Sequence, residues 1–291
     1  MQRMINIDFE LIGKPNLWSY ISLAGRDVMK KSKEGEMAEE KRVILEYIIN
    51  RASLPSEEIK KILESTLQAL LGCGYEVRRV KIKALSQALV GGSEAFGEIP
   101  FEVGLYFDPI LNVPYIPGST IKGAVRAGVF DLMLNWKTSE EEAEKRAEVE
   151  VKRLFGDNKC AGLIGFTDAY PIEKGENGYL LYPDVMTPHY KSNTATELDV
   201  SPTPIIYLTI APGTKFQFYM FFKRERGSGE SKRQLTVGDS KNSDLAENPI
   251  PDPNRLGILD RGLLYSFYRG VGAKTSVGYS RFEILSYESI G

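Results

Sequence analysis

The sequence predicts an α+β fold, in which helices and strands share one core without alternating strictly. Residues 15–72 carry apolar side chains at helical spacings, whereas short strand-like segments begin at residue 75. Three further helical segments interrupt those strands, and no internal repeat is present. The chain has 291 residues, 42% of them hydrophobic, which suffices for a substantial core.

The N-terminal part is predicted to be helical. Val43, Ile44 and Ile48 form one apolar stripe, and a second helix begins after Pro55. Apolar residues at spacings of three and four follow, until glycine stops the helix at Gly72. We therefore expect a helical extension over residues 1–72 and a separate core over residues 73–291.

The core is predicted to begin with a strand over residues 75–83, with Arg78, Lys81 and Lys83 exposed. A helix follows the segment 114–123, because residues from Ile121 to Trp136 place apolar side chains on one face. Ser119 or Thr120 is the expected N-cap of that helix.

Further elements follow in order. A second helix is expected from Ser139, within a capping box, to about Gly156. Strands are expected at 163–168 and 178–182. Residues 204–210 and 215–222 predict a β-hairpin with its turn at 211–214. Residues 224–254 are polar and predict a flexible insertion. A last helix from Leu256 to Phe267, a glycine-rich loop and a strand at 278–285 complete the chain.

The composition excludes several classes of protein. The net charge is −2, so any nucleic-acid surface must be a local basic patch. One histidine and two cysteines cannot supply the four ligands of a Cys/His zinc site, and no other metal or cofactor is indicated. Cys73 and Cys160 are expected to be small buried residues. No long apolar run or signal-peptide core is present, so we expect a cytoplasmic protein that does not contact membranes.

The glycine-rich loop near the C-terminus is the first candidate site. It contains three glycines and four polar side chains suited to phosphate: Gly270, Gly272, Gly278, Lys274, Thr275, Ser276 and Arg281. Its spacing is not that of a Walker A loop, and its helix-to-strand order is the reverse of a dinucleotide fingerprint. The alternative is a structural turn in which Gly270 is the helix C-cap.

The second candidate is the helix start at residues 117–126. Lys122 lies in the first turn, where a cation is unfavourable to the helix dipole, and Arg126 follows four residues later. Together with Ser119 and the first amides of the helix, they could bind an anion. The alternative is a solvated polar face opposite the apolar stripe.

The third candidate is His189-Tyr190-Lys191, whose rings could stack on a base. A catalytic base would need a nucleophile nearby, and none is evident, so an ordinary loop is the alternative. Several carboxylates could hold a metal, although solvated or capping roles are the default: Glu94, Glu98, Asp108, Asp168 and Asp184.

Two of these segments together resemble the RAMP family of CRISPR-associated proteins. Residues 117–126, Pro-Gly-Ser-Thr-Ile-Lys-Gly-Ala-Val-Arg, are similar to the family's PGS-x-hydrophobic-KG-x-x-R motif. Residues 270–282 resemble its C-terminal glycine-rich signature. Segments 165–171, 184–190 and 202–209 resemble one branch, the sixth subunit of the type III-B Cmr effector complex.

The resemblance implies a ferredoxin-like, RRM-like core with insertions. It implies an RNA-binding backbone subunit that contacts guide RNA near its 3′ side, target RNA and other Cmr-complex subunits. The family's cleaving subunit has an aspartate in a loop after its first strand, whereas the comparable loop at residues 89–100 has only Glu94 and Glu98. We therefore expect no enzyme activity. The alternative is a RAMP-family ribonuclease that acts on guide precursor or target RNA.

Overall fold

The computed structural model describes residues 16–29, 34–134, 140–187, 204–223 and 256–290. Several predictions fall on residues outside these ranges. They concern Trp136, Ser139, residues 188–203 and the insertion at 224–254.

The central sheet is antiparallel, with strands in the order β4-β8-β1-β9. These strands are β1 (Tyr75–Ala84), β4 (Ile164–Phe166), β8 (Lys215–Lys223) and β9 (Phe282–Ile290). A short strand, β5 (Tyr170–Glu173), also pairs with β8. The predicted strands at 75–83, 163–168 and 278–285 are confirmed, each with somewhat different ends.

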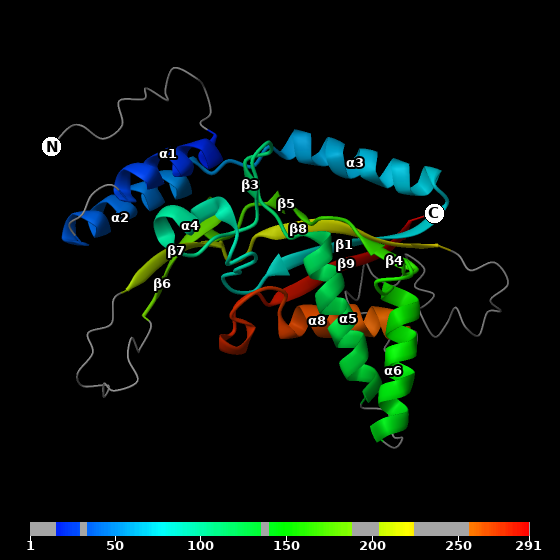
Figure 1. Ribbon diagram of the computed structural model, residues 1–291. Helices are drawn as coiled ribbons and strands as arrows, with labels where there is room; N and C mark the ends of the chain where they lie inside the picture. Colours follow the sequence, from blue (N-terminus) through cyan, green and yellow to red (C-terminus); the bar gives the residue numbers. More distant parts are fainter. Residues whose placement is uncertain (1–15, 30–33, 135–139, 188–203, 224–255, 291) are drawn as a thin grey trace, which may run out of the picture.

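Helices cover both faces of this sheet (Figure 1). On one face lies α3 (Ser56–Gly72), which buries Ile59, Leu63 and Leu67. The other face carries α5 (Gly118–Leu134) and α8 (Ile258–Arg269), and α6 (Glu140–Phe155) packs against α5. Phe267 of α8 stacks on Phe218 of β8 with ring centroids 5.7 Å apart. The sheet is therefore the middle layer of three.

A smaller antiparallel pair, β6 (Leu181–Met186) and β7 (Ile205–Ile210), extends to one side of the main sheet (Figure 1). It packs near α2 (Glu34–Arg51) and α4 (Ala95–Phe101), and α1 (Leu17–Met29) packs on α2 and α4. A two-stranded ladder of β2 (Phe107–Asp108) and β3 (Val113–Pro114) and the 3₁₀ turns η2 (Glu176–Gly178) and η4 (Thr275–Val277) complete the elements.

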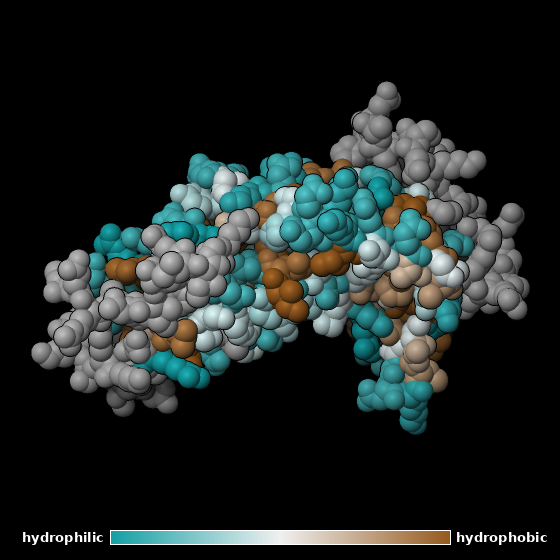
Figure 2. Space-filling view, turned by 90° about the horizontal axis from the view of Figure 1, so that it is seen from above, coloured by the Kyte–Doolittle hydropathy of each residue, from teal (hydrophilic) through white to brown (hydrophobic). Residues whose placement is uncertain are grey.

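The N-terminal helices α1, α2 and α3 confirm the prediction of helical structure between residues 15 and 72. They contribute to one continuous hydrophobic cluster with the sheet, from Leu17 to Tyr287. The face seen from above is mostly hydrophilic, with apolar residues gathered near its middle (Figure 2). The boundary proposed at residue 72 stays a prediction.

The predicted hairpin of residues 204–222 is wrong. Both strands exist, but β7 pairs with β6, whereas β8 pairs with β1. The turn itself forms, since the Thr214 amide donates to the Ala211 carbonyl. However, the Gly213 amide donates to Ala84 and the Ala84 amide donates to Thr214, which directs the chain onto β1. Tertiary pairing thus separates two strands that their sequence spacing would join.

The predicted exposure of Arg78 is also wrong, since this side chain is only 6% exposed. Side chains alternate between the two faces of a strand, and Arg78 lies in the same row of β1 as Val80, Ile82 and Ala84, which are all buried. The Arg78 guanidinium lies 5.7 Å from the ring centroid of Phe222 and donates to the Ser289 hydroxyl. Lys81 and Lys83 are partly exposed.

Two smaller expectations are corrected. The helix after Pro117 begins at Gly118, so Ser119 and Thr120 lie within its first turn rather than at the N-cap. Cys73 and Cys160 are exposed rather than buried. Cys73 directly follows α3, and Cys160 lies in the turn after α6, so both occupy surface connections.

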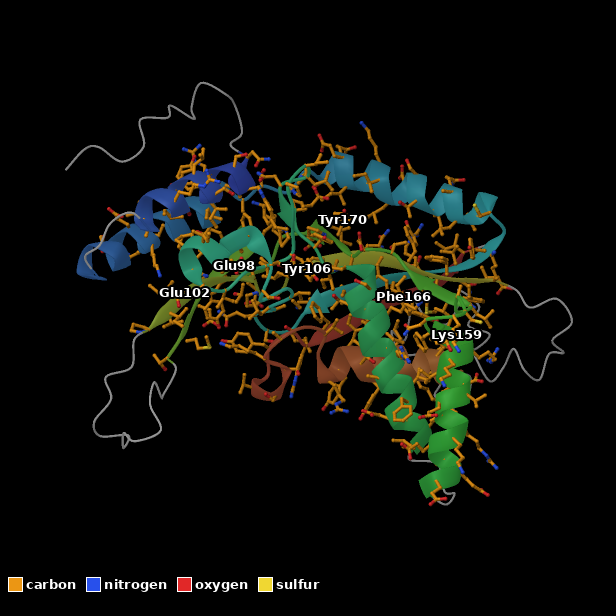
Figure 3. The ribbon with its side chains drawn as sticks, viewed as in Figure 1. Glu98, Glu102, Tyr106, Lys159, Phe166 and Tyr170 are labelled. Carbon is orange, nitrogen blue, oxygen red and sulfur yellow. The ribbon has the colours of Figure 1, made fainter. Side chains whose placement is uncertain are left out.

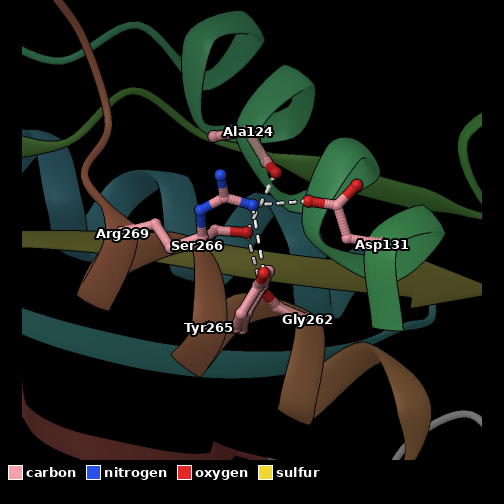
Figure 4. Close-up of polar contacts among 6 residues, drawn as sticks. All are labelled: Ala124, Asp131, Gly262, Tyr265, Ser266 and Arg269. Atoms are coloured by element: carbon pink, nitrogen blue, oxygen red, sulfur yellow. Dashed lines mark hydrogen bonds and ion pairs between the residues drawn. The ribbon is translucent and has the colours of Figure 1, made fainter. Parts of the chain in front are cut away.

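The crossing of α5 and α8 depends on close backbone approach (Figure 4). The Ser266 hydroxyl of α8 donates to the Ala124 carbonyl of α5 at 2.9 Å. A Cβ atom on Gly128 would lie 2.3 Å from the Ser266 oxygen and 2.9 Å from the Gly262 carbonyl oxygen. Arg269 bonds Asp131 across the same interface at 2.6 Å. Position 128 therefore accommodates no side chain.

Two glycines of α5 offer a matched test. We expect Gly128→Ala to lower the free energy of unfolding by about 1–3 kcal/mol, because overpacking forces the helices apart. Gly123→Ala should raise it by up to about 1 kcal/mol, because alanine favours helix and nothing lies within 4 Å of the added methyl. Chemical denaturation of the full chain measures both, and equal effects would contradict this crossing geometry.

Candidate nucleic-acid interface

The glycine-rich loop, residues 270–281, connects α8 to β9. Gly270 is the C-cap of α8 with φ 114°, which confirms its predicted capping role. Gly278 ends η4 in the left-handed region, φ 92°. Several loop amides donate inward, including Val271 to Ser280, and Val277 and Tyr279 to Lys274. The loop is therefore an ordered turn.

Hydrogen bonds hold the loop against the segment that follows β1, residues 86–89. The Ala273 amide donates to the Leu89 carbonyl at 2.7 Å, and the Leu89 amide donates to the Ser280 hydroxyl at 3.0 Å. A Cβ on Gly272 would lie 2.5 Å from the Leu89 oxygen. Ser86 also donates to the Gly278 carbonyl at 2.7 Å. The structural-turn interpretation is thus confirmed for the inner side of the loop.

The predicted phosphate ligands of the loop differ in exposure. Gly272, Ser276 and Arg281 are exposed, and Thr275 is partly exposed. Lys274 instead turns inward: its ammonium donates to the Tyr207 hydroxyl and lies 5.1 Å from the Tyr279 ring centroid. The outer side of the loop thus presents one exposed cation, Arg281, with hydroxyl and backbone groups.

A carboxylate lies at the centre of the contacts around Lys274. Both Tyr207 and Tyr279 donate their hydroxyls to Oδ2 of Asp184 in β6, the latter at 2.7 Å. Burial raises the pKa of both tyrosines, and the bonds to Asp184 raise it further. The two phenols therefore remain protonated donors at neutral pH.

The second candidate site lies at the start of α5. The Gly118 amide donates to Oδ1 of Asp168 at 2.7 Å, so a carboxylate from the loop before β5 caps the helix. A Cβ on Gly118 would lie 2.3 Å from the Phe166 carbonyl oxygen. Ser119 is exposed and Lys122 partly exposed. The helix start is therefore held tightly while its polar side chains face solvent.

Arg126 is exposed and lies away from α8. It follows Ala124, which contacts α8, by two residues, so it projects about 200° further around the helix. Backbone bonds from Lys159 and Cys160 lower the pKa of the Asp157 carboxyl, and nearby Arg126 contributes to this shift. The structure thus places Arg126 towards the α6–β4 connection rather than beside the glycine-rich loop.

The third candidate, His189, Tyr190 and Lys191, lies outside the described residues. The strands that flank residues 188–203 are described, and β6 and β7 form an antiparallel pair. Of the expected strand at 178–182, only Leu181 and Tyr182 lie in β6, whereas Gly178 ends the 3₁₀ turn η2.

The carboxylates mostly have structural roles. Asp108 accepts the amides of Ile110 and Leu111, and Asp168 caps α5, which confirms the predicted capping role for these two. Glu94 accepts the Tyr106 hydroxyl, and this bond raises the pKa of that tyrosine. Glu98 is exposed on α4 (Figure 3). In the described ranges, no group of three or more His, Cys, Asp or Glu residues could hold a metal ion.

A row of tyrosines near the start of α5 was missed by sequence reasoning. The rings of Tyr106 and Tyr115, and those of Tyr115 and Tyr170, have centroids 5.8 Å apart. All three are half-buried, and Tyr170 donates to Asp108 at 2.9 Å (Figure 3 labels Tyr106 and Tyr170). Aromatic faces of this kind can stack on bases. The three tyrosines come from separate segments, so their spacing in the sequence does not predict that their rings lie together.

No helix in the part of the chain that the structure describes is long and apolar enough to span a membrane.

Comparisons with known proteins agree with the motifs. Residues 81–283 match the model of the RAMP superfamily. The chain is 36% identical to the CMR subunit Cmr6 of Saccharolobus solfataricus, over 86% of this chain and 72% of that protein. It is 26% identical to the Cmr6 of Pyrococcus furiosus, over 69% of this chain and 66% of that protein.

One solved structure is similar along nearly the whole chain. It belongs to the type III-B Cmr-beta complex bound to cognate target RNA, with a TM-score of 0.71 and 29% identity. The match covers 97% of this chain and 96% of that one. Family model, relatives and structure therefore agree, and the chain belongs to the RAMP superfamily, in the family of the Cmr6 subunits.

Proposed function

We propose that this chain is a non-catalytic RNA-binding backbone subunit of a type III-B effector complex in the cytoplasm. The observation that carries the proposal is the likeness, over 97% of the chain, to a subunit of a Cmr-beta complex bound to target RNA. Its partners would be guide RNA near the 3′ side, target RNA and other Cmr subunits.

The core of this subunit is ferredoxin-like in the proposal. Its support is the connectivity β1-α5-β4-β8-α8-β9 with the strand order β4-β8-β1-β9. Two β-α-β units then interleave, so that β8 separates the parallel strands β1 and β4, and β1 separates β8 and β9. The helix α6 and the pair β6–β7 are insertions in this arrangement.

RNA would bind at the ends of helices rather than on the open face of a sheet. Domains of the RRM type stack bases on the sheet face opposite their helices. Here α3 packs on that face, over β1, β5 and β8. The remaining candidates are the outer side of the glycine-rich loop and the start of α5, which present Ser276, Arg281, Lys122 and Arg126.

The chemistry offered by these surfaces suits a nucleic-acid backbone of any sequence. Hydroxyl, guanidinium and ammonium groups position phosphates without reading bases. The half-buried tyrosines beside α5 could add stacking, which every base permits. A subunit that holds guides of differing sequence needs this kind of tolerance. The net charge of −2 fits a local basic strip on a surface that otherwise meets proteins.

The absence of catalysis is proposed from the segment 89–100. It carries no aspartate, and its Glu94 is the N-cap residue of α4 and accepts the Tyr106 hydroxyl. The second candidate function, a RAMP-family ribonuclease, rests on His189 and on the exposed Glu98. Of the two glutamates in this segment, Glu98 is exposed and Glu94 is partly buried.

Salt dependence tests the proposed RNA contacts. Arg281→Gln and Arg126→Gln should each weaken binding to single-stranded RNA and reduce the slope of log affinity against log salt by about 0.7, since one phosphate contact is lost. Lys60→Gln, on the exposed side of α3, is the matched control and should change neither. Filter binding at several salt concentrations measures the slope; slopes equal to that of the parent chain would contradict the proposal.

An RNA cleavage assay tests the non-catalytic role. Incubation of the purified chain with labelled RNA, with or without divalent metal, should leave the RNA intact. If RNA is cleaved and His189→Ala or Glu98→Ala abolishes the cleavage, the ribonuclease alternative replaces the non-catalytic role. The variant Glu102→Ala, an exposed glutamate just after α4 (Figure 3), controls for a loss of charge alone.

A further inference from the structure

Lys274 has an unusual backbone for its residue type. Its φ is 58°, in the left-handed region, where residues other than glycine and asparagine are uncommon. Such a conformation costs on the order of 1 kcal/mol and persists where surrounding contacts hold it. At this position the Lys274 carbonyl accepts the amides of Val277 and Tyr279, and the Lys274 ammonium reaches two aromatic rings and a phenol oxygen.

The ammonium is the first member of a chain of hydrogen bonds. Lys274 donates to the hydroxyl of Tyr207, which is fully buried, and that hydroxyl donates to Asp184. The same carboxylate accepts from Tyr279 at 2.7 Å. The Lys274 nitrogen also lies 4.7 Å from the Tyr207 ring centroid, within cation–π range. The positive charge of Lys274 is thus balanced locally by Asp184.

The four residues join three segments. Asp184 on β6 and Tyr207 on β7 are direct cross-strand partners. Lys274 and Tyr279 belong to the glycine-rich loop. The cluster therefore contacts the β6–β7 pair within its ladder, two residue pairs before the ladder ends at Met186 and Ile205. Gln87 connects the same two parts indirectly, because its side-chain amide donates to the Pro183 carbonyl of β6 at 3.3 Å and its carbonyl accepts the Ser280 amide of the loop.

We propose that Lys274 and Asp184 act as a latch, through Tyr207 and Tyr279, that fixes the β6–β7 pair against the glycine-rich loop. Lys274 is then a positioning residue and not a phosphate ligand, in contrast to Arg281. The proposal deepens the proposed function, because it assigns the loop's two cations separate duties. The latch does not require bound RNA, because all of its contacts lie within the folded chain.

A phosphate that competed for Lys274 would disturb the charge balance of the latch. It would leave the Asp184 carboxylate with two phenol donors and no nearby ammonium, which is unfavourable in a partly buried site. Charge balance therefore retains Lys274 in the cluster when an anion approaches, and the orientation of β6–β7 relative to the loop is preserved.

Hydrogen exchange of the full chain without RNA tests the latch. Lys274→Gln and Asp184→Asn should each accelerate amide exchange in β6 and β7 about tenfold, as expected for losing a hydrogen bond to a charged group. The double variant should exchange little faster than either single one, because both remove the same interaction. Tyr207→Phe keeps the ring, removes the shared hydroxyl and should reproduce the effect if Asp184→Asn folds poorly.

The control and the RNA measurement separate this proposal from the proposed function. Lys60→Gln should leave exchange in β6 and β7 unchanged. In RNA binding, Lys274→Gln should keep the salt slope of the parent chain, whereas Arg281→Gln reduces it. Unchanged exchange in Lys274→Gln, or a slope reduced as in Arg281→Gln, would overturn the latch. If the parent chain binds no RNA, the proposed function fails while the exchange result still decides the latch.

Discussion

The arrangement of the molecule depends on the segment 86–89, which continues from β1 and is bonded on both sides. Ala88 exchanges backbone hydrogen bonds with Ile210 at the end of β7, at 3.2 and 2.8 Å. Leu89 pairs with Ala273 of the glycine-rich loop and with Ser280. Because one short segment contacts both partners, it positions β6–β7 relative to the C-terminal loop, and the proposed latch joins the two directly. The absence of a side chain at Gly272 permits this approach.

This constraint explains why the family's glycine-rich signature has two faces. The inner face is a set of backbone contacts that any substitution with a Cβ would disturb at Gly272. The outer face presents Ser276 and Arg281 to solvent. A rigid inner face gives the outer one a defined shape, which favours contact with an RNA backbone since little ordering remains to be done on binding. Structural and functional interpretations of the loop are therefore compatible.

Local patterns predicted most elements, because helical spacing and glycine or proline breaks act within a few residues. The helices from α1 to α3, the start of α8 and the C-cap at Gly270 follow from such patterns. Strand pairing and side-chain burial could not be predicted from such local patterns, because they depend on distant segments. The predicted hairpin was wrong because Ala84 bonds the turn residues Gly213 and Thr214, and the predicted exposure of Arg78 was wrong because its row of β1 side chains is buried.

The candidate sites also combine features that local sequence predicts with features that depend on distant segments. The two motif segments could be found from residue types and spacing, and the family comparisons agree with them. The inward turn of Lys274 could not, because Asp184 and Tyr207 lie far from it in sequence. The tyrosine row of Tyr106, Tyr115 and Tyr170 is likewise assembled only by folding.

The central claim is that RNA contacts the outer side of the glycine-rich loop and the start of α5, while α3 covers the sheet. Photocrosslinking of a complex loaded with guide and target RNA, with mass spectrometry of this chain, tests it directly. The crosslinked peptides should contain residues 275–281 and 119–126. Crosslinks confined to α3 or to the β1 face that α3 covers, with none in those two segments, would contradict it.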